Sequence, residues 1–230
     1  SIFHSMIKYI YNKLKFFSFE KIIINYFCKG WSNKRHWKFF QEVFSRKKKF
    51  KNIALLGVYR GKDLGYMCSA LKKNNGKDFH IYAIDLFDFK TPFRKIGNKK
   101  IWQQDQNFLE PSIESSKRIV KFLGCTKNVT YIKGDFLKIK KLKSKLDFVY
   151  IDIAHDYKTT FQAIDICKKL GGKNILFSGD DFYNGYTLNT PWGVKKAVKK
   201  KFSKFKVHYN YIWESSEKYY KKNKNYQYKW

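Results

Sequence analysis

The feature that most restricts the fold of this chain begins at residue 52, where short apolar runs start to alternate with segments of helical periodicity. The first run, IALL at 53–56, is wholly apolar, which is typical of a strand buried on both faces of a parallel sheet. Repeated strand–helix–strand units with short connections predict an α/β domain with a doubly wound sheet and right-handed crossovers.

The same pattern predicts where the elements lie. We expect a Rossmann-like, mostly parallel seven-stranded sheet with strands at 53–56, 79–84, 129–132, 148–151, 174–177, 207–213 and 226–228. Helices are expected at 62–73, 112–123, 137–142, 158–170 and 194–202. This domain takes residues 51–230. Residues 1–50 are basic and of helical periodicity, with one helix over 31–44, and we interpret them as an N-terminal helical extension. That extension is a candidate dimer or substrate-side element, which leaves a homodimer open.

The net charge of +31 is the strongest compositional feature, and it would ordinarily indicate nucleic acid or another polyanion. Only five of the 49 basic residues are arginine, the residue suited to bidentate phosphate recognition. The lysine excess accompanies many Asn, Ile, Tyr and Phe, as an AT-rich gene would encode. We therefore favour compositional bias over nucleic-acid binding, and expect the charge to attract an anionic small substrate.

Cysteine usage and hydropathy bear on the compartment. Cys28, Cys68, Cys125 and Cys167 are scattered, which favours free thiols in a reducing cytoplasm over a disulfide framework or a zinc site. No stretch approaches the roughly 18 apolar residues of a membrane-spanning helix, and the first 17 residues do not resemble a secretory signal. We expect a cytoplasmic protein with no transmembrane segment.

Ligands of open α/β sheets bind beyond the carboxyl ends of the strands, so the residues there are candidates for cofactor binding. The first strand is followed by GVYRG at 57–61, which is not the dinucleotide pattern G-x-G-x-x-G. The second ends at Asp85, whose carboxylate can accept hydrogen bonds from both ribose hydroxyls of an adenosyl ligand. After the third, GDF at 134–136 would place a carboxylate and an aromatic ring beside an adenine. The predicted cofactor contacts are Gly57, Tyr59, Gly61, Asp85, Leu86, Gly134, Asp135, Phe136 and Asp152.

Each of these motifs also has a purely structural reading. Glycines are common in β–α turns, Asp85 could be a solvated loop residue, and Asp135 could cap a helix. Three such strand ends in sequence order are harder to explain in this way than any one of them.

Acidic residues follow the next two strands. Asp152 ends the fourth, and Asp180 and Asp181 end the fifth, and neighbouring strands lie only about 4.8 Å apart. Clustered carboxylates repel one another, and a hard cation with oxygen ligands, Mg²⁺ or Mn²⁺, relieves that repulsion. Salt bridges to the many lysines are the alternative. His155 lies three residues after Asp152. Histidine side chains can accept a proton near neutral pH, so His155 is a candidate general base, or it could contact only cofactor or backbone.

These motifs resemble those of class I S-adenosylmethionine (SAM)-dependent methyltransferases. YIDIAHDY at 150–157 and SGDDF at 178–182 resemble the macrocin O-methyltransferase-like branch, whose members are metal-dependent. The resemblance covers about residues 50–205. It implies SAM as methyl donor, a metal on Asp152, Asp180 and Asp181, and catalysis by His155 with Asp152. One departure is Leu55, which stands where the family often has an acidic residue for the methionine end of SAM.

The predicted function is therefore metal-dependent O-methylation of a small hydroxylated substrate. The resemblance and the positive charge together favour a sugar or nucleotide-activated sugar for surface polysaccharide. An RNA or other nucleic-acid methyltransferase is the alternative; the charge favours it, whereas few arginines and no Asn-Pro-Pro-Tyr-like motif oppose it. A non-enzymatic module that binds a membrane or polyanion through its basic N-terminal helices is a third reading. The intact acidic set argues against that reading.

Two segments are candidates for walls of the substrate site. The long stretch 87–110 contains Arg94, Lys95 and Trp102 and has the length of a functional lid. The stretch 183–192, directly after the acidic pair, is the second candidate.

Overall fold

The computed structural model describes residues 18–88, 111–187 and 190–221. It has seven strands in one sheet, in the order β3-β2-β1-β4-β5-β9-β8. The strands are β1 (Asn52–Leu56), β2 (His80–Asp85), β3 (Val129–Lys133), β4 (Leu146–Ile151), β5 (Gly171–Gly179), β8 (Lys206–His208) and β9 (Ile212–Ser216). Strands β1 to β5 pair in parallel, whereas β9 runs antiparallel to both β5 and β8. The predicted Rossmann-like, mostly parallel seven-stranded sheet is confirmed.

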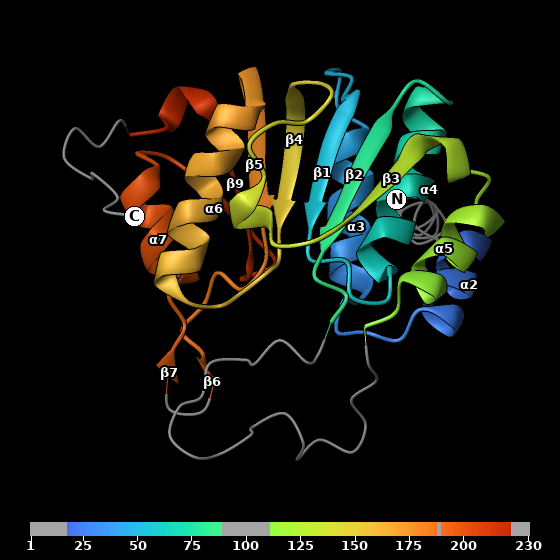
Figure 1. Cartoon of the computed structure of the whole chain (residues 1–230), viewed down its shortest axis with the longest axis horizontal. Coiled ribbons are helices and arrows are strands. Elements are labelled where there is room, and N and C mark those ends of the chain that lie inside the picture. The colour runs from blue at the N-terminus through green and yellow to red at the C-terminus, as the bar shows by residue number, and fades with distance from the viewer. Residues whose placement is uncertain (1–17, 89–110, 188–189, 222–230) are drawn as a thin grey trace, which may run out of the picture.

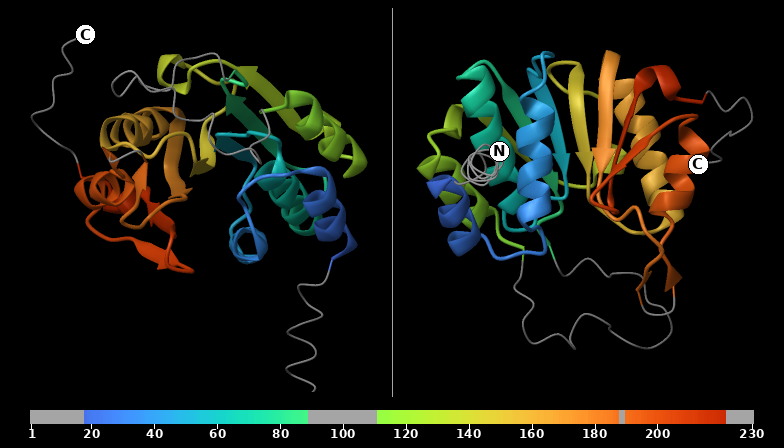
Figure 2. Two further views of the ribbon diagram at one scale, coloured as in Figure 1. Left: turned by 90° about the horizontal axis from the view of Figure 1, so that it is seen from below. Right: turned by 180° about the vertical axis from the view of Figure 1, so that it is seen from behind.

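Helices cover both faces of this sheet (Figures 1 and 2). One face carries α2 (Phe19–Phe27), α3 (Lys34–Phe44), α4 (Lys62–Asn75) and α5 (Ile113–Phe122). The other carries α6 (Tyr157–Leu170) and α7 (Val194–Lys201). A small hairpin, β6 (Tyr186–Thr187) with β7 (Thr190–Pro191), extends below the sheet between β5 and α7.

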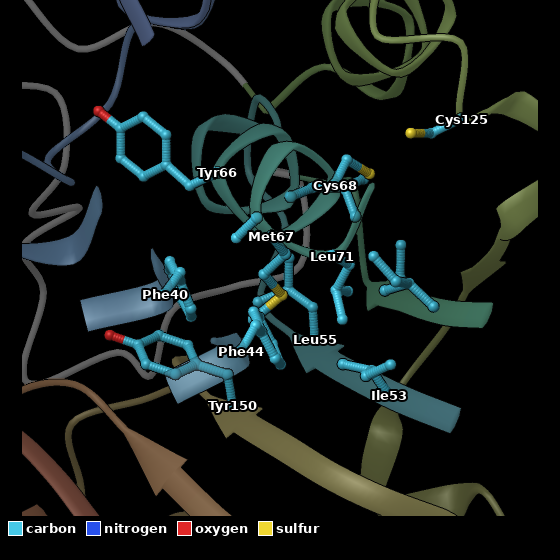
Figure 3. Packing of buried hydrophobic residues seen from close by; sticks show 14 of the residues in the cluster. Phe40, Phe44, Ile53, Leu55, Tyr66, Met67, Cys68, Leu71, Cys125 and Tyr150 are labelled. Carbon is cyan, nitrogen blue, oxygen red and sulfur yellow. The ribbon is translucent and has the colours of Figure 1, made fainter. Parts of the chain in front are cut away.

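The strands contribute side chains to two separate apolar layers, because successive side chains of a strand point to opposite faces of the sheet. Ile53 and Leu55 of β1 pack against α3 and α4, whereas Ala54 and Leu56 pack in the layer beneath α6 and α7. Figure 3 shows the first layer, in which aromatic rings of α3 meet Tyr150 of β4. This explains why the strand segments are almost wholly apolar.

Helix α3 belongs to the same core as the sheet. Trp37, Phe39, Phe40 and Phe44 are all buried, and Phe40 lies 4.9 Å from Tyr150 between ring centroids. Just beyond α3, Arg46 donates two hydrogen bonds, of 2.9 and 2.7 Å, to the Glu214 carboxylate on β9. Burial raises the pKa of Glu214, but the nearby His208 and the hydrogen-bonded Arg46 outweigh it and bring the pKa to about 2.

The sheet's far edge differs from the prediction. The segment expected as one strand at 207–213 is a hairpin, in which Tyr209 and Asn210 take positive φ values of 54° and 73° and separate β8 from β9. These two strands complete the seven, and the strand expected at 226–228 lies outside the described residues. The helix expected at 137–142 is only a 3₁₀ turn at Phe136–Lys138. Among the described residues, no helix combines the length and apolarity needed to cross a membrane.

Candidate functional site

The predicted site residues lie in one row along the carboxyl edge of the sheet, because backbone hydrogen bonds continue one residue past each strand. Gly134, which follows β3, donates a backbone hydrogen bond of 2.9 Å to Asp85 O of β2. Gly57, which follows β1, donates one of 2.9 Å to Ile84 O, also of β2. The next two links are Asp152 N to Leu56 O at 2.8 Å and Asp180 N to Ile151 O at 3.2 Å. The row crosses the β1–β4 boundary, where the strand order reverses and ligands of such sheets bind.

Both glycines of the GVYRG turn are required by its geometry. Gly57 and Gly61 have φ values of 86° and 89°. A Cβ on Gly57 would lie 1.7 Å from the carbonyl oxygen of Asp152, and one on Gly61 would lie 2.6 Å from the hydroxyl of Ser116. The turn therefore passes very close to the end of β4 and to α5, where a side chain would not fit.

Asp85 organises this turn. Its Oδ2 accepts hydrogen bonds from the backbone N–H of Val58 and Tyr59 at 2.6 and 2.7 Å, and its Oδ1 accepts one from Phe87 N at 2.9 Å. A carboxylate has about four lone-pair sites, so the contacts from the described residues leave one site on Oδ1 for a ribose hydroxyl. Accepting both ribose hydroxyls, as the sequence predicts, would require one of the amide bonds to be released.

Three residues at this edge have left-handed backbone conformations that side chains seldom adopt. Tyr59, Phe87 and Asp181, which follow β1, β2 and β5, have φ values of 53°, 47° and 62°. Such conformations persist where the surrounding structure enforces them, often at functional sites. Their concentration here supports the carboxyl edge as the site.

The other predicted cofactor contacts differ in their exposure. A Cβ on Gly134 would meet nothing within 4 Å, so the space beside it is open, and Leu86 is exposed. Asp135 accepts a hydrogen bond from Leu137 N at 2.9 Å, which is the capping role weighed above. Phe136 is buried in the core, so its ring does not present an open face for an adenine. The Tyr59 ring stacks on Trp31, with centroids 5.1 Å apart.

The three acidic residues do converge. Asp152, Asp180 and Asp181 each offer a carboxylate oxygen, and these oxygens lie within 4.8 Å of one another. Burial, followed by repulsion from Asp180 and Asp181, holds the pKa of Asp152 well above its usual range. An oxygen-only set of clustered carboxylates fits a hard divalent cation, because the cation would offset both the repulsion and the lost hydration.

Two histidines flank this acidic cluster. His155 Nε2 lies 2.9 Å from Asp181 Oδ2, and its ring stacks on Trp192 at 4.1 Å between centroids and an angle of 9°. His36, at the start of α3, places Nε2 2.8 Å from Asp180 Oδ2. Because His36 Nδ1 accepts the backbone N–H of Asn33 at 3.1 Å, its proton lies on Nε2 and is donated to Asp180. Both carboxylates after β5 are therefore oriented by a histidine.

His36 and Asp63 are site residues that the sequence analysis missed. The Asn33-x-x-His36 spacing predicts a helix cap, which is present, but nothing in it indicates a contact with a residue 144 positions away. Asp63, in the first turn of α4, is buried, and burial raises its pKa while His36 lowers it and Asp180 raises it again. Its Oδ1 has no hydrogen-bond partner within the described part of the chain, and the same holds for the buried Tyr150 hydroxyl.

The segments expected to wall the site are only partly visible. Arg94, Lys95 and Trp102 fall outside the described residues. In the second segment, Trp192 lies against His155, and Tyr183 packs on Trp192 at 4.8 Å between centroids. That segment therefore contributes aromatic side chains next to the acidic cluster.

Residues 55–182, more than half of the chain, match the model of a family described as a methyltransferase domain. The chain belongs to this family, and it is a class I methyltransferase. The family assignment and the fold confirm the prediction made from the strand-end motifs. None of the curated protein sequences matches this methyltransferase significantly.

Solved structures with the same fold include several O-methyltransferases. One from Bacillus cereus, in complex with SAH, has 12% identity and a TM-score of 0.60, with 91% of this chain and 96% of that one covered. A SAM-dependent O-methyltransferase from Thermotoga maritima has 14% identity and a TM-score of 0.56, covering 86% and 71%. The O-methyltransferase TomG from Streptomyces achromogenes, in complex with SAM, has 12% identity and a TM-score of 0.53, covering 80% of each chain. At such identities the likeness shows the fold alone.

Proposed function

We propose that this methyltransferase transfers the methyl group of SAM to a hydroxyl of a small substrate, with a divalent cation, Mg²⁺ or Mn²⁺, held by Asp152, Asp180 and Asp181. The observation that carries the proposal is the convergence of these three carboxylates beside His155, at the edge where the fold binds its ligands. The O-methyltransferases of the same fold, two of them solved with SAM or SAH, support the choice of cofactor and reaction.

The cofactor would lie along the row formed by the ends of β1, β2 and β3. Gly57 and Gly61 let the turn pack closely against the end of β4 and against α5, and Asp85 keeps one acceptor site for a ribose hydroxyl. Asp152, at the adjoining end of β4, would border both the cofactor and the cation. Bound SAM supplies a methyl group on a positively charged sulfur, and the cation would make the substrate hydroxyl easier to deprotonate.

His155 is the proposed general base. When its ring is neutral and Nε2–H is donated to Asp181, Nδ1 is the free acceptor for the hydroxyl proton. The oxygen then bonds to the methyl carbon as the carbon–sulfur bond breaks, and the proton remains on His155. Asp181 orients the ring and stabilises its charged form, while stacking on Trp192 restricts its rotation.

For the acceptor we propose a sugar, including nucleotide-activated sugars used for surface polysaccharide. The lysine-rich surface supports an anionic acceptor, because it raises the local concentration of negatively charged molecules. The same charge is the one observation that favours the alternative, methylation of RNA. Tight, salt-sensitive RNA binding without transfer to sugar acceptors would promote that alternative.

The proposed function is tested by chelation. With labelled SAM and a panel of nucleotide sugars, EDTA is expected to abolish methyl transfer, and added Mg²⁺ or Mn²⁺ is expected to restore it. Titration calorimetry with SAH in the presence of EDTA should still show binding, because the cofactor row does not depend on the cation. Methyl transfer that continues unchanged in EDTA would contradict the proposed role of the cation. Failure to bind SAH would contradict the proposed use of SAM as methyl donor.

A further inference from the structure

A cavity of about 640 Å³ lies over the start of α6 and along α7, with Tyr157, Asn184 and Trp192 among its lining residues. Four of the residues that line it are lysines on one side of α7, namely Lys195, Lys196, Lys199 and Lys200. They stand at positions i, i+1, i+4 and i+5, so they form two adjacent rows on the helix surface. The cavity thus has one strongly positive wall.

One lining residue, Trp192, connects this cavity to the proposed catalytic histidine. Trp192 lines the cavity, and its ring also stacks on His155 at 4.1 Å. Gly193 N donates a hydrogen bond of 2.6 Å to the backbone oxygen of His155. A Cβ on Gly193 would lie 2.1 Å from Tyr157 N, so the start of α7 is packed tightly against the start of α6. A ligand in the cavity would be separated from His155 by a single aromatic ring.

The lysine wall is electrostatically unfavourable unless an anion is present. Like charges at i, i+4 destabilise a helix, by about 0.2–0.5 kcal/mol per pair, and Lys195 and Lys196 lie in the first turn, where the helix dipole disfavours cations. In the described part of the chain none of the four lining lysines has an acidic partner, whereas the next residue, Lys201, pairs with Asp165. The mutual repulsion of the four lysines therefore favours a multiply charged anion as ligand. The helix dipole adds to this only at Lys195 and Lys196, because Lys199 and Lys200 lie in the last turn.

We propose that this cavity binds the phosphate or diphosphate group of the acceptor and so directs the acceptor's hydroxyl toward His155. The inference rests on the proposed function and specifies its substrate class as a phosphate-bearing molecule. Lysine ammonium groups act as point charges that several phosphate oxygens can share, so recognition here does not need the planar fork of arginine. Lys196 Nζ lies 5.3 Å from the centroid of the Tyr157 ring, so one of the lining ammonium groups lies over an aromatic ring that also lines the cavity.

The test measures binding of inorganic pyrophosphate and of uridine diphosphate by calorimetry, in EDTA and without SAM. The variant Lys196→Gln/Lys200→Gln removes two charges from the cavity wall. The matched control, Lys47→Gln/Lys77→Gln, removes two exposed lysines that precede β1 and β2, at the opposite edge of the sheet. We expect the Kd for pyrophosphate to rise at least about tenfold in the cavity variant and to change less than about twofold in the control.

Other outcomes separate this proposal from the proposed function. Equal weakening in both variants, or no pyrophosphate binding by the unmodified protein, would overturn the cavity assignment. The cavity assignment would also be overturned if the cavity substitutions weakened RNA binding more than they weakened pyrophosphate binding. A further outcome is methyl transfer with equal KM values for phosphorylated and for neutral acceptors, in the cavity variant as in the control. In that case the cavity assignment fails and the proposed function stands. If pyrophosphate binds as expected but no hydroxylated acceptor is methylated, the proposed function fails instead.

Discussion

Replacing Asp181 by asparagine is expected to reduce methyl transfer by about 10³-fold under saturating SAM and Mg²⁺. Asparagine has nearly the same size as aspartate and tolerates the left-handed backbone at this position, where φ is 62°. The substitution therefore changes charge more than shape. It removes one of the three converging carboxylates and the anion beside His155, so it weakens both cation binding and the stabilisation of a protonated His155.

The matched control is Asp78→Asn, which removes an exposed carboxylate paired with Lys51 at the opposite edge of the sheet. Initial rates should be close to those of the unmodified protein in this control. Both variants should unfold within about 1 kcal/mol of the unmodified protein in urea, because Asp78 is exposed and because the loss of the Asp181 charge also relieves repulsion within the acidic cluster. A rate for Asp181→Asn within a few fold of the unmodified protein would exclude Asp181 from the catalytic site.

Gly57→Ala is expected to destabilise the protein by at least about 3 kcal/mol and to abolish SAH binding. The new Cβ would lie 1.7 Å from the Asp152 carbonyl oxygen, so the turn after β1 and the end of β4 would have to separate. The positive φ of 86° adds about 1–2 kcal/mol of strain for any residue with a side chain. Because the same movement would displace Asp152, both the cofactor row and the acidic cluster would be disrupted.

Gly76→Ala isolates the backbone contribution to this effect. Gly76 also has a positive φ, 63°, but a Cβ there would meet nothing within 4 Å. Urea unfolding should show a smaller loss, of about 1–2 kcal/mol, for Gly76→Ala, with SAH binding unchanged. Equal destabilisation of the two variants would mean that the close approach of the turn to β4 contributes nothing.

The parts of the site that could be predicted from the sequence are those set by strand position. A wholly apolar run such as 53–56 indicates a buried strand, and a parallel sheet brings the residues after its strands to one edge. The convergence of Asp152, Asp180 and Asp181 followed from that rule alone. The orientation of Phe136 did not, because a Gly-Asp-Phe turn does not determine whether the ring points outward or into the core.

The remaining site residues depend on tertiary packing. His36 contacts Asp180 because the aromatic side chains of α3 pack that helix against β4. No local sequence pattern specifies this packing. The alternating aromatic tract at 207–213 indicated one strand, and only Asn210 in it favours a turn. The domain boundary after residue 50, a homodimer and a cytoplasmic location stay predictions.

The most direct test is a crystal structure with SAH and Mn²⁺, using the anomalous signal of manganese to locate the cation. The account predicts a peak within about 2.3 Å of carboxylate oxygens from Asp152, Asp180 and Asp181, with SAH beside Gly57 and Asp85. An SAH-bound structure without manganese at these carboxylates, or with SAH remote from them, would contradict it.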